Sequence, residues 1–186
     1  DIIIDSNKAF NVLEPEIQNV ACSGGNTGAI KITAQNFDTT NGFQYSINGG
    51  TWKTSTVSPV TEGGLIAGTY TVDVRSDATG TCTKSFRKTI GSGTPVTVTA
   101  SVTAPLTCTL KATITAVADG GTGPYKYELR GADGVAVLVA FQDLATFPNI
   151  LKGSYTVVAQ DINGCPSGAS TVVVVDDPIP PTASLA

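Results

Sequence analysis

Four cysteines are the residues of this sequence whose type and spacing most restrict the possible chemistry: Cys22, Cys82, Cys108 and Cys165. Four cysteines can pair in three ways. Each half of the chain contains two of them, and each pair brackets the same kinds of segment, so the sequence favours Cys22 with Cys82 and Cys108 with Cys165. Disulfides persist in oxidising compartments, which predicts an extracellular protein. Zinc binding is disfavoured, because the spacing is not C-x-x-C and the sequence has no histidine.

The absence of histidine also removes the commonest general base at neutral pH. A serine nucleophile needs a base and an orienting acid, so we expect no enzymatic activity, no catalytic residue and no cofactor. The net charge of −4 and the pI of about 4.6 leave no basic stripe for phosphates, which argues against nucleic-acid binding. No apolar run approaches the ~20 residues of a membrane span, so membrane insertion is not expected.

Two further groups of side chains are candidates for ligand binding. The single tryptophan, Trp52, could stack on a sugar ring, although an aromatic residue beside a hairpin more often covers the rim of a core. Acidic and amide side chains in turns could supply oxygen ligands to calcium, but turn stabilisation by hydrogen bonds is the simpler interpretation, and no metal site is predicted. These calcium candidates are Asp77, Asp161 and Asn163, with Asp176 and Asp177 in a linker.

An internal repeat shows which elements must position these residues. The segment GFQYSINGG recurs as GPYKYELRG, and LIAGTYTV recurs as ILKGSYTV, so that Phe43 matches Tyr125 and Tyr70 matches Tyr155. Matched residues are 82 to 86 positions apart, and the offset changes only between the matching segments. Loops of different length on one scaffold produce this pattern, because surface connections tolerate insertions.

The repeated segments alternate apolar and polar residues with the period of a β-strand, and no segment shows the period and caps of a helix. Asn48-Gly49-Gly50 predicts a tight hairpin turn. Short strands with frequent glycine-rich turns predict an all-β fold, with two tandem immunoglobulin-like β-sandwich modules and one intramodule disulfide in each. The side chains expected to face the cores are Ile30, Ile32, Tyr45, Tyr70, Val72, Val74, Ala112, Ile114, Ala116, Tyr127, Tyr155, Val157 and Ala159.

The repeat also predicts the domain boundaries. Module 1 is expected over residues 9–93 and module 2 over residues 94–178, with a flexible boundary at Gly91–Pro95. Residues 1–8 are similar to the last strand of a module and are interpreted as the end of a preceding repeat with its linker. Residues 179–186 are interpreted as a linker and the start of the next repeat. The proline-rich exit favours an extended arrangement of successive modules.

The pattern of an early cysteine, a G-x-x-x-Y-x-Y-type strand with an N-G-G hairpin, and an L-x-x-G-x-Y-T-V strand ending in D-x-x-G-C resembles the SprB-type repeat of large cell-surface adhesins from gliding bacteria. In module 1 it is carried by Gly42, Phe43, Tyr45, Asn48, Gly49, Gly50, Leu65, Gly68, Tyr70, Val72, Gly80 and Cys82. In module 2 it is carried by Gly123, Tyr125, Tyr127, Ile150, Gly153, Tyr155, Val157, Asp161, Gly164 and Cys165. Module 2 departs from the pattern in lacking the hairpin Asn-Gly-Gly and the tryptophan.

The resemblance implies a stalk segment of a long filamentous adhesin, involved in surface attachment and gliding motility. It further implies export through the outer membrane by type IX secretion to the cell surface. The expected partners are neighbouring repeats of the same polypeptide, other surface or motility-machinery proteins and a substratum polysaccharide. The alternative from the residues is a carbohydrate-binding extracellular β-sandwich module that uses Trp52.

Overall fold

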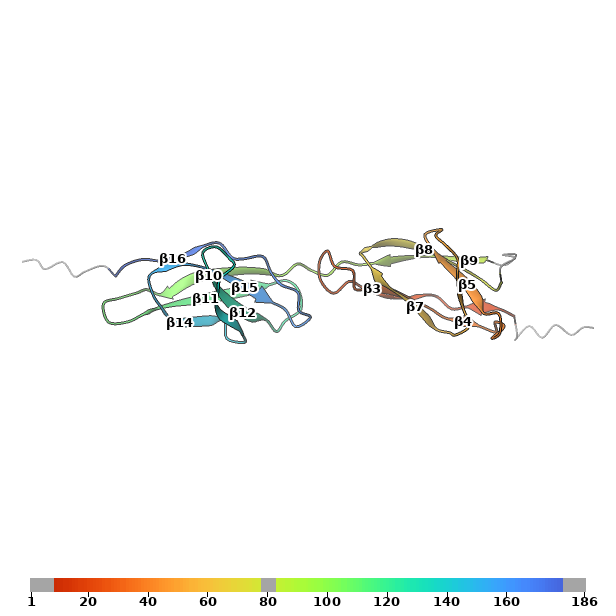
Figure 1. The fold of residues 1–186 in the computed structure, drawn as a ribbon, viewed down its shortest axis with the longest axis horizontal. Helices are drawn as coiled ribbons and strands as arrows, with labels where there is room; N and C mark the ends of the chain where they lie inside the picture. Colours follow the sequence, from red (N-terminus) through yellow and green to blue (C-terminus); the bar gives the residue numbers. More distant parts are fainter. Residues whose placement is uncertain (1–8, 78–82, 179–186) are drawn as a thin grey trace, which may run out of the picture. The chain divides into compact units, whose positions relative to one another are not determined.

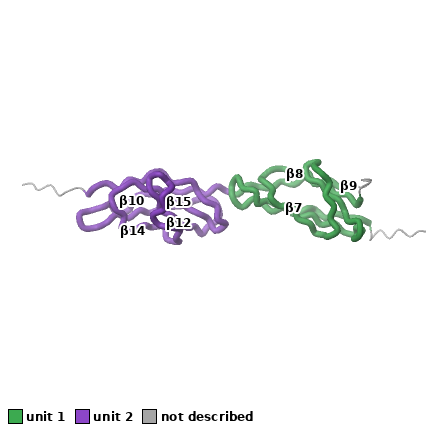
Figure 2. The backbone as a smooth tube through the Cα atoms, in the orientation of Figure 1, with its two compact units in different colours: residues 1–93 green, residues 94–186 purple. Residues whose placement is uncertain are grey.

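The computed structural model describes residues 9–77 and 83–178 (Figure 1). The chain divides between Gly93 and Thr94 into two compact units, unit 1 over residues 1–93 and unit 2 over residues 94–186 (Figure 2). The expected strand in residues 1–8 and the expected start of a repeat in residues 179–186 lie outside the described residues. Every regular element in the described ranges is a β-strand, and no helix there could span a membrane.

Unit 1 contains a three-stranded and a four-stranded antiparallel sheet in its described residues. The first sheet has the order β2-β3-β7, and the second has the order β6-β5-β8-β9. Strands β1 and β4 form a separate two-stranded antiparallel sheet. The strands are β1 (Asn11–Val12), β2 (Glu16–Gln18), β3 (Gly28–Ile32), β4 (Ala34–Gln35), β5 (Phe43–Ile47), β6 (Lys53–Ser55), β7 (Val60–Leu65), β8 (Gly68–Arg75) and β9 (Thr83–Ile90).

Unit 2 repeats this topology in its described part. Its three-stranded sheet has the order β10-β11-β14, and its four-stranded sheet has the order β13-β12-β15-β16. These seven strands, divided three and four between two antiparallel sheets, form an immunoglobulin-like sandwich, so the predicted all-β fold is confirmed. The strands are β10 (Thr97–Ala104), β11 (Ala112–Asp119), β12 (Lys126–Gly131), β13 (Val137–Gln142), β14 (Thr146–Ile150), β15 (Gly153–Gln160) and β16 (Val173–Val175).

Each unit has a core formed by side chains from both of its sheets. In unit 1, Ile30 from the three-stranded sheet and Phe43 and Val72 from the four-stranded sheet belong to one buried cluster. In unit 2, Ile114 and Phe147 on one sheet and Val157 on the other are buried to 1% exposure or less. The predicted inward-facing residues on β3, β5, β8, β11, β12 and β15 are buried, with Tyr70 and Tyr155 only half-buried.

Tyr70 and Tyr155 have a second structural role that the alternation alone does not reveal. The Tyr70 hydroxyl donates to the carbonyl oxygen of Ile66 at 2.9 Å, and the Tyr155 hydroxyl donates to that of Leu151 at 3.0 Å. Both tyrosines lie near the start of the strand that precedes the last strand of their unit. A tyrosine that hydrogen-bonds a few residues upstream at this corner is a recurring feature of immunoglobulin-like sandwiches.

The predicted hairpin after β5 is confirmed. Asn48 and Gly49 have φ angles of 51° and 67°, and strands β5 and β6 pair with Tyr45 opposite Lys53. Asparagine and glycine tolerate this left-handed conformation at low steric cost, which explains why they occupy the turn. The turn places Trp52 immediately before β6.

Candidate functional site

The bonding of the cysteines differs from the prediction. Cys22 and Cys165 are disulfide-bonded, whereas Cys108 is a free and exposed thiol. Cys82 lies outside the described residues. The prediction of one disulfide within each module is therefore wrong, because Cys108 is free while Cys165 is bonded, so module 2 has no Cys108–Cys165 bridge.

The geometry of unit 2 explains why Cys108 and Cys165 do not pair. Cys108 follows β10, whose last residue pairs with Thr113 at the end of the unit where the chain leaves. The segment before Cys165 lies at the opposite end, where Thr122 N donates to Asp161 Oδ2 at 3.0 Å. An eight-residue strand such as β10 spans roughly 25 Å, whereas a disulfide needs Cα atoms within about 7 Å of each other.

Unit 1 places Cys22 at its C-terminal end, beside the point where the chain leaves. Val20 N donates to the carbonyl oxygen of Gly91 at 3.0 Å, and Gly91 N donates to the side-chain oxygen of Asn19 at 2.8 Å. A Cβ on Gly93 would lie 2.1 Å from the carbonyl oxygen of Ala21, so only glycine fits this close approach. These contacts fix the backbone on the N-terminal side of Cys22.

Cys165 lies in a corresponding way at the N-terminal end of unit 2. A Cβ on Gly120 would lie 2.0 Å from the carbonyl oxygen of Pro95, and Gly120 has a φ of 76°, so the incoming chain passes directly over this turn. Cys22 thus lies near the last residues of unit 1 and Cys165 near the first residues of unit 2.

Asp161 holds the turn that contains Cys165. Its carboxylate is buried, with the residue 5% exposed, and accepts three backbone N–H groups. Oδ1 accepts from Asn163 N at 2.9 Å and from Cys165 N at 2.8 Å, and Oδ2 accepts from Thr122 N at 3.0 Å. The carboxylate therefore fixes the backbone of the bonded cysteine directly, as an acceptor of N–H groups rather than as a ligand for a cation.

The remaining calcium candidates do not converge. Asp77 accepts a hydrogen bond from the Ser76 hydroxyl, and Asp177 forms an ion pair with Lys152. This carboxylate, by its hydrogen bond first and then by its charge, raises the pKa of Lys152 above its ordinary value. Within residues 9–77 and 83–178, no group of three or more acidic or cysteine side chains is arranged to hold a metal ion.

Trp52 is half-buried, and Arg75 occupies one of its faces. The guanidinium carbon of Arg75 lies 3.9 Å from the ring centroid, and its Nε donates to Gln44 Oε1 at 2.9 Å. This is a cation–π contact on a ring that the arginine partly covers. A sugar that stacked on Trp52 would need the uncovered part of the ring or would have to displace Arg75, so the role of Trp52 in ligand binding stays a prediction.

The sequence reasoning missed two functional features of the cysteines. It missed the free thiol of Cys108, because it assigned the repeated cysteines to one bridge per module without asking at which end of a sandwich each one lies. It also missed the acceptor role of Asp161 toward Cys165, although the D-x-N-G-C spacing contains the signal. An aspartate that hydrogen-bonds to the backbone two residues later is a recognised turn.

A family model described as the SprB repeat matches residues 100–134, which confirms the resemblance in that segment. No curated protein matches the chain. Among solved structures, the fibronectin(III)-like modules of Clostridium thermocellum CbhA are 17% identical, with 90% of this chain and 94% of that chain covered and a TM-score of 0.38. The C-terminal 282-residue fragment of intimin, in complex with the intimin-binding domain of its translocated receptor, is 13% identical, with 89% and 64% covered and a TM-score of 0.39.

Proposed function

We propose that this chain is a stalk segment of a long filamentous cell-surface adhesin that serves surface attachment and gliding motility. The match of residues 100–134 to the SprB repeat and the shared topology of the two units support a repetitive surface protein. The disulfide supports an oxidising, extracellular location. In this proposal the protein is exported through the outer membrane by type IX secretion.

The repeated topology of the two units is the observation that carries the proposal. Each unit has a three-stranded sheet, β2-β3-β7 or β10-β11-β14, and a four-stranded sheet, β6-β5-β8-β9 or β13-β12-β15-β16. A protein that repeats one sandwich module gains length with each copy, which is the property a stalk requires.

The proposed role is structural and needs no catalytic group or cofactor. The partners that it implies are neighbouring repeats of the same polypeptide and, for the complete adhesin, other surface or motility-machinery proteins and a substratum polysaccharide. Contact with the substratum belongs in this proposal to other parts of the adhesin, because a stalk transmits force without recognising a ligand.

A carbohydrate-binding module is the alternative function, and Trp52 is the observation that favours it. The ring is half-buried rather than fully buried, and aromatic rings with an accessible face are common stacking surfaces for sugars. The covering Arg75 weakens this alternative, because its contact with the ring would be lost on stacking.

Titration of the full chain with a panel of bacterial and plant polysaccharides separates the two functions. We expect no saturable binding by isothermal calorimetry, and no difference between the wild-type chain and Trp52→Ala. The matched control is Phe86→Ala, which removes a half-buried aromatic ring from β9, on the same sheet. Saturable binding that Trp52→Ala abolishes and Phe86→Ala retains would replace the stalk with the carbohydrate-binding function.

A further inference from the structure

Two segments of unit 1 lie side by side, although they are far apart in the sequence. The first segment covers residues 11–21 and includes β1 and β2, and the last segment covers residues 84–93 and includes most of β9. Near the start of both segments, Lys84 Nζ donates to Asn11 Oδ1 at 3.1 Å and to the carbonyl oxygen of Val12 at 3.3 Å. A lysine of β9 therefore binds both residues of β1.

The contacts continue along the two segments. The Lys88 ammonium forms an ion pair with Glu14 Oε1 at 2.9 Å, and the Lys88 side chain is only 18% exposed. Farther along, Val20 N donates to the carbonyl oxygen of Gly91 at 3.0 Å, and Gly91 N donates to Asn19 Oδ1 at 2.8 Å. Lysine side chains thus join the segments near their start, and the backbone joins them near their end.

The order of these contacts shows that the first and last segments run in the same direction. Residue numbers rise together in both, from the contact of Lys84 with Asn11 to the close approach of Gly93 to Ala21. When the ends of unit 1 are pulled apart, the first segment is drawn toward its N-terminus and the last segment toward its C-terminus. Parallel segments loaded in this way are sheared past each other, so all the contacts between them bear the load together.

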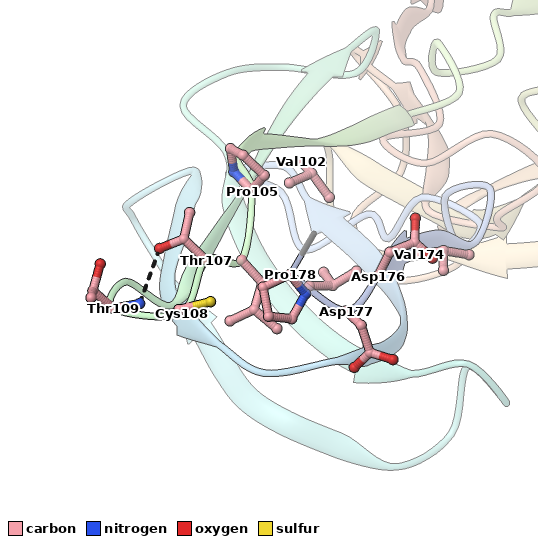
Figure 3. Close-up of a pocket in the computed structure, with 11 residues that line it drawn as sticks. Val102, Pro105, Thr107, Cys108, Thr109, Val174, Asp176, Asp177 and Pro178 are labelled. Carbon is pink, nitrogen blue, oxygen red and sulfur yellow. Dashed lines mark hydrogen bonds between the residues drawn. The ribbon is translucent and has the colours of Figure 1, made fainter. Parts of the chain in front are cut away.

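Unit 2 is open where unit 1 is joined. In the repeat, β10 and the turn after it correspond to the first segment, and β16 with the residues after it corresponds to the end of the last segment. Between them lies an open hollow of about 810 Å³, lined by Val102 and Pro105 from one part and by Val174 and Pro178 from the other (Figure 3). Within residues 94–178, all of which the structure describes, no hydrogen bond joins these two parts.

The sequence explains this difference between the units. At the offset of 86 that relates the first cysteines of the two repeats, Asn19 corresponds to Pro105. A proline has neither a backbone N–H nor a side-chain acceptor, so it cannot replace the contact that Asn19 makes. In the last strand, Lys88 corresponds to Val173, which is apolar and cannot form an ion pair. The joining contacts of unit 1 at these two positions therefore have no counterpart in unit 2.

We propose that the first and last segments of unit 1 form a shear clamp, which makes unit 1 resist stretching longer than unit 2. In a shear clamp several contacts must break in one step, whereas contacts that are loaded at one end open one after another at lower force. Unit 2 then unfolds first and lengthens the stalk while unit 1 stays folded. This inference rests on the proposed function, because only a load-bearing module is pulled between its two ends.

Stretching the full chain at constant force tests the clamp, with dithiothreitol present so that non-covalent contacts alone bear the load. We expect two unfolding steps of similar length, since the units are equally long, and a folded lifetime about tenfold longer for one unit than for the other. Gly93→Ala is expected to shorten the longer lifetime about tenfold and to leave the shorter one unchanged, because clamp contacts break in the transition state of forced unfolding. The added Cβ would lie 2.1 Å from the carbonyl oxygen of Ala21.

The matched control for Gly93→Ala is Gly63→Ala in β7 of the same unit. A Cβ on Gly63 meets no atom within 4 Å, so both lifetimes are expected to stay unchanged. The same chemical change then differs only in whether it pushes the first and last segments apart.

A second variant tests the clamp even if Gly93→Ala prevents unit 1 from folding. Lys88→Met removes the ion pair with Glu14, keeps the length of the side chain, and is expected to shorten the longer lifetime about threefold. Its control is Lys53→Met, which removes the ion pair with Glu62 between β6 and β7, outside the two segments. The control is expected to leave the lifetime unchanged, because that pair is still formed when the clamp breaks.

A longer lifetime that Lys88→Met shortens and Lys53→Met leaves unchanged supports the clamp. Equal lifetimes of the two units in the wild-type chain, or equal effects of the two lysine variants, overturn it. The polysaccharide titration has its own outcome whatever these lifetimes are, so failure of the clamp is distinguishable from failure of the proposed function.

Discussion

Replacing Asp161 with asparagine is expected to destabilise unit 2 by about 2 to 4 kcal/mol. The buried carboxylate accepts three backbone N–H groups, one of them from Cys165. An asparagine keeps one oxygen but turns an amide N–H₂ group toward a backbone donor, and it removes the charge that strengthens these bonds. The total free energy of unfolding of a domain of this size is ~5 to 10 kcal/mol, so the substitution would remove a large share of it.

Urea denaturation of the reduced chain measures this effect without the disulfide. Fluorescence of Trp52, the single tryptophan, reports on unit 1, and circular dichroism reports on both units. We expect the tryptophan transition to stay in place while part of the circular dichroism change moves to lower urea. The matched control is Asp143→Asn, which makes the same chemical change at an exposed residue. An equal shift for the two variants would contradict this prediction, because the three N–H contacts of Asp161 would then add no more stability than an exposed carboxylate does.

Much of the fold could be predicted from the sequence, because the strands of a sandwich bury one face and therefore alternate apolar and polar residues. Alternation placed Val72 and Val74 in the core of unit 1, and Ile114 and Val157 in that of unit 2. Asn48 and Gly49 marked their hairpin, since few other residues accept a positive φ there. The repeat placed equivalent strands in both halves, and this equivalence holds in the strand order of the sheets.

The disulfide could not be predicted in the same way. A strand pattern tells which face of a sheet a residue occupies but says nothing about which end of the sandwich a loop reaches. Cys108 and Cys165 bracket the same strands as Cys22 and Cys82, and the sequence interpretation took this as a reason to pair them within a module. The first cysteine of unit 2 follows a strand that runs away from the second, so the two lie at opposite ends of the unit.

Trp52 shows a different limit of sequence reasoning. The sequence predicted that Trp52 lies beside a hairpin. It could not predict the contact with Arg75, because Arg75 lies on β8 and reaches the ring only through the pairing of β5 with β8. Contacts that depend on register between distant strands become visible only once the sheet is assembled. The same holds for Thr122 and Asp161, which lie on different loops at one end of unit 2.

Peptide mapping of the chain, purified and digested without reductant after its free thiols have been blocked, tests most directly how the two cysteines of unit 2 are bonded. The expected result is a disulfide-bonded peptide that contains Cys165, with Cys108 recovered in blocked form. Recovery of Cys108 joined to Cys165 would contradict this account, because the two residues would then have to lie at the same end of the unit.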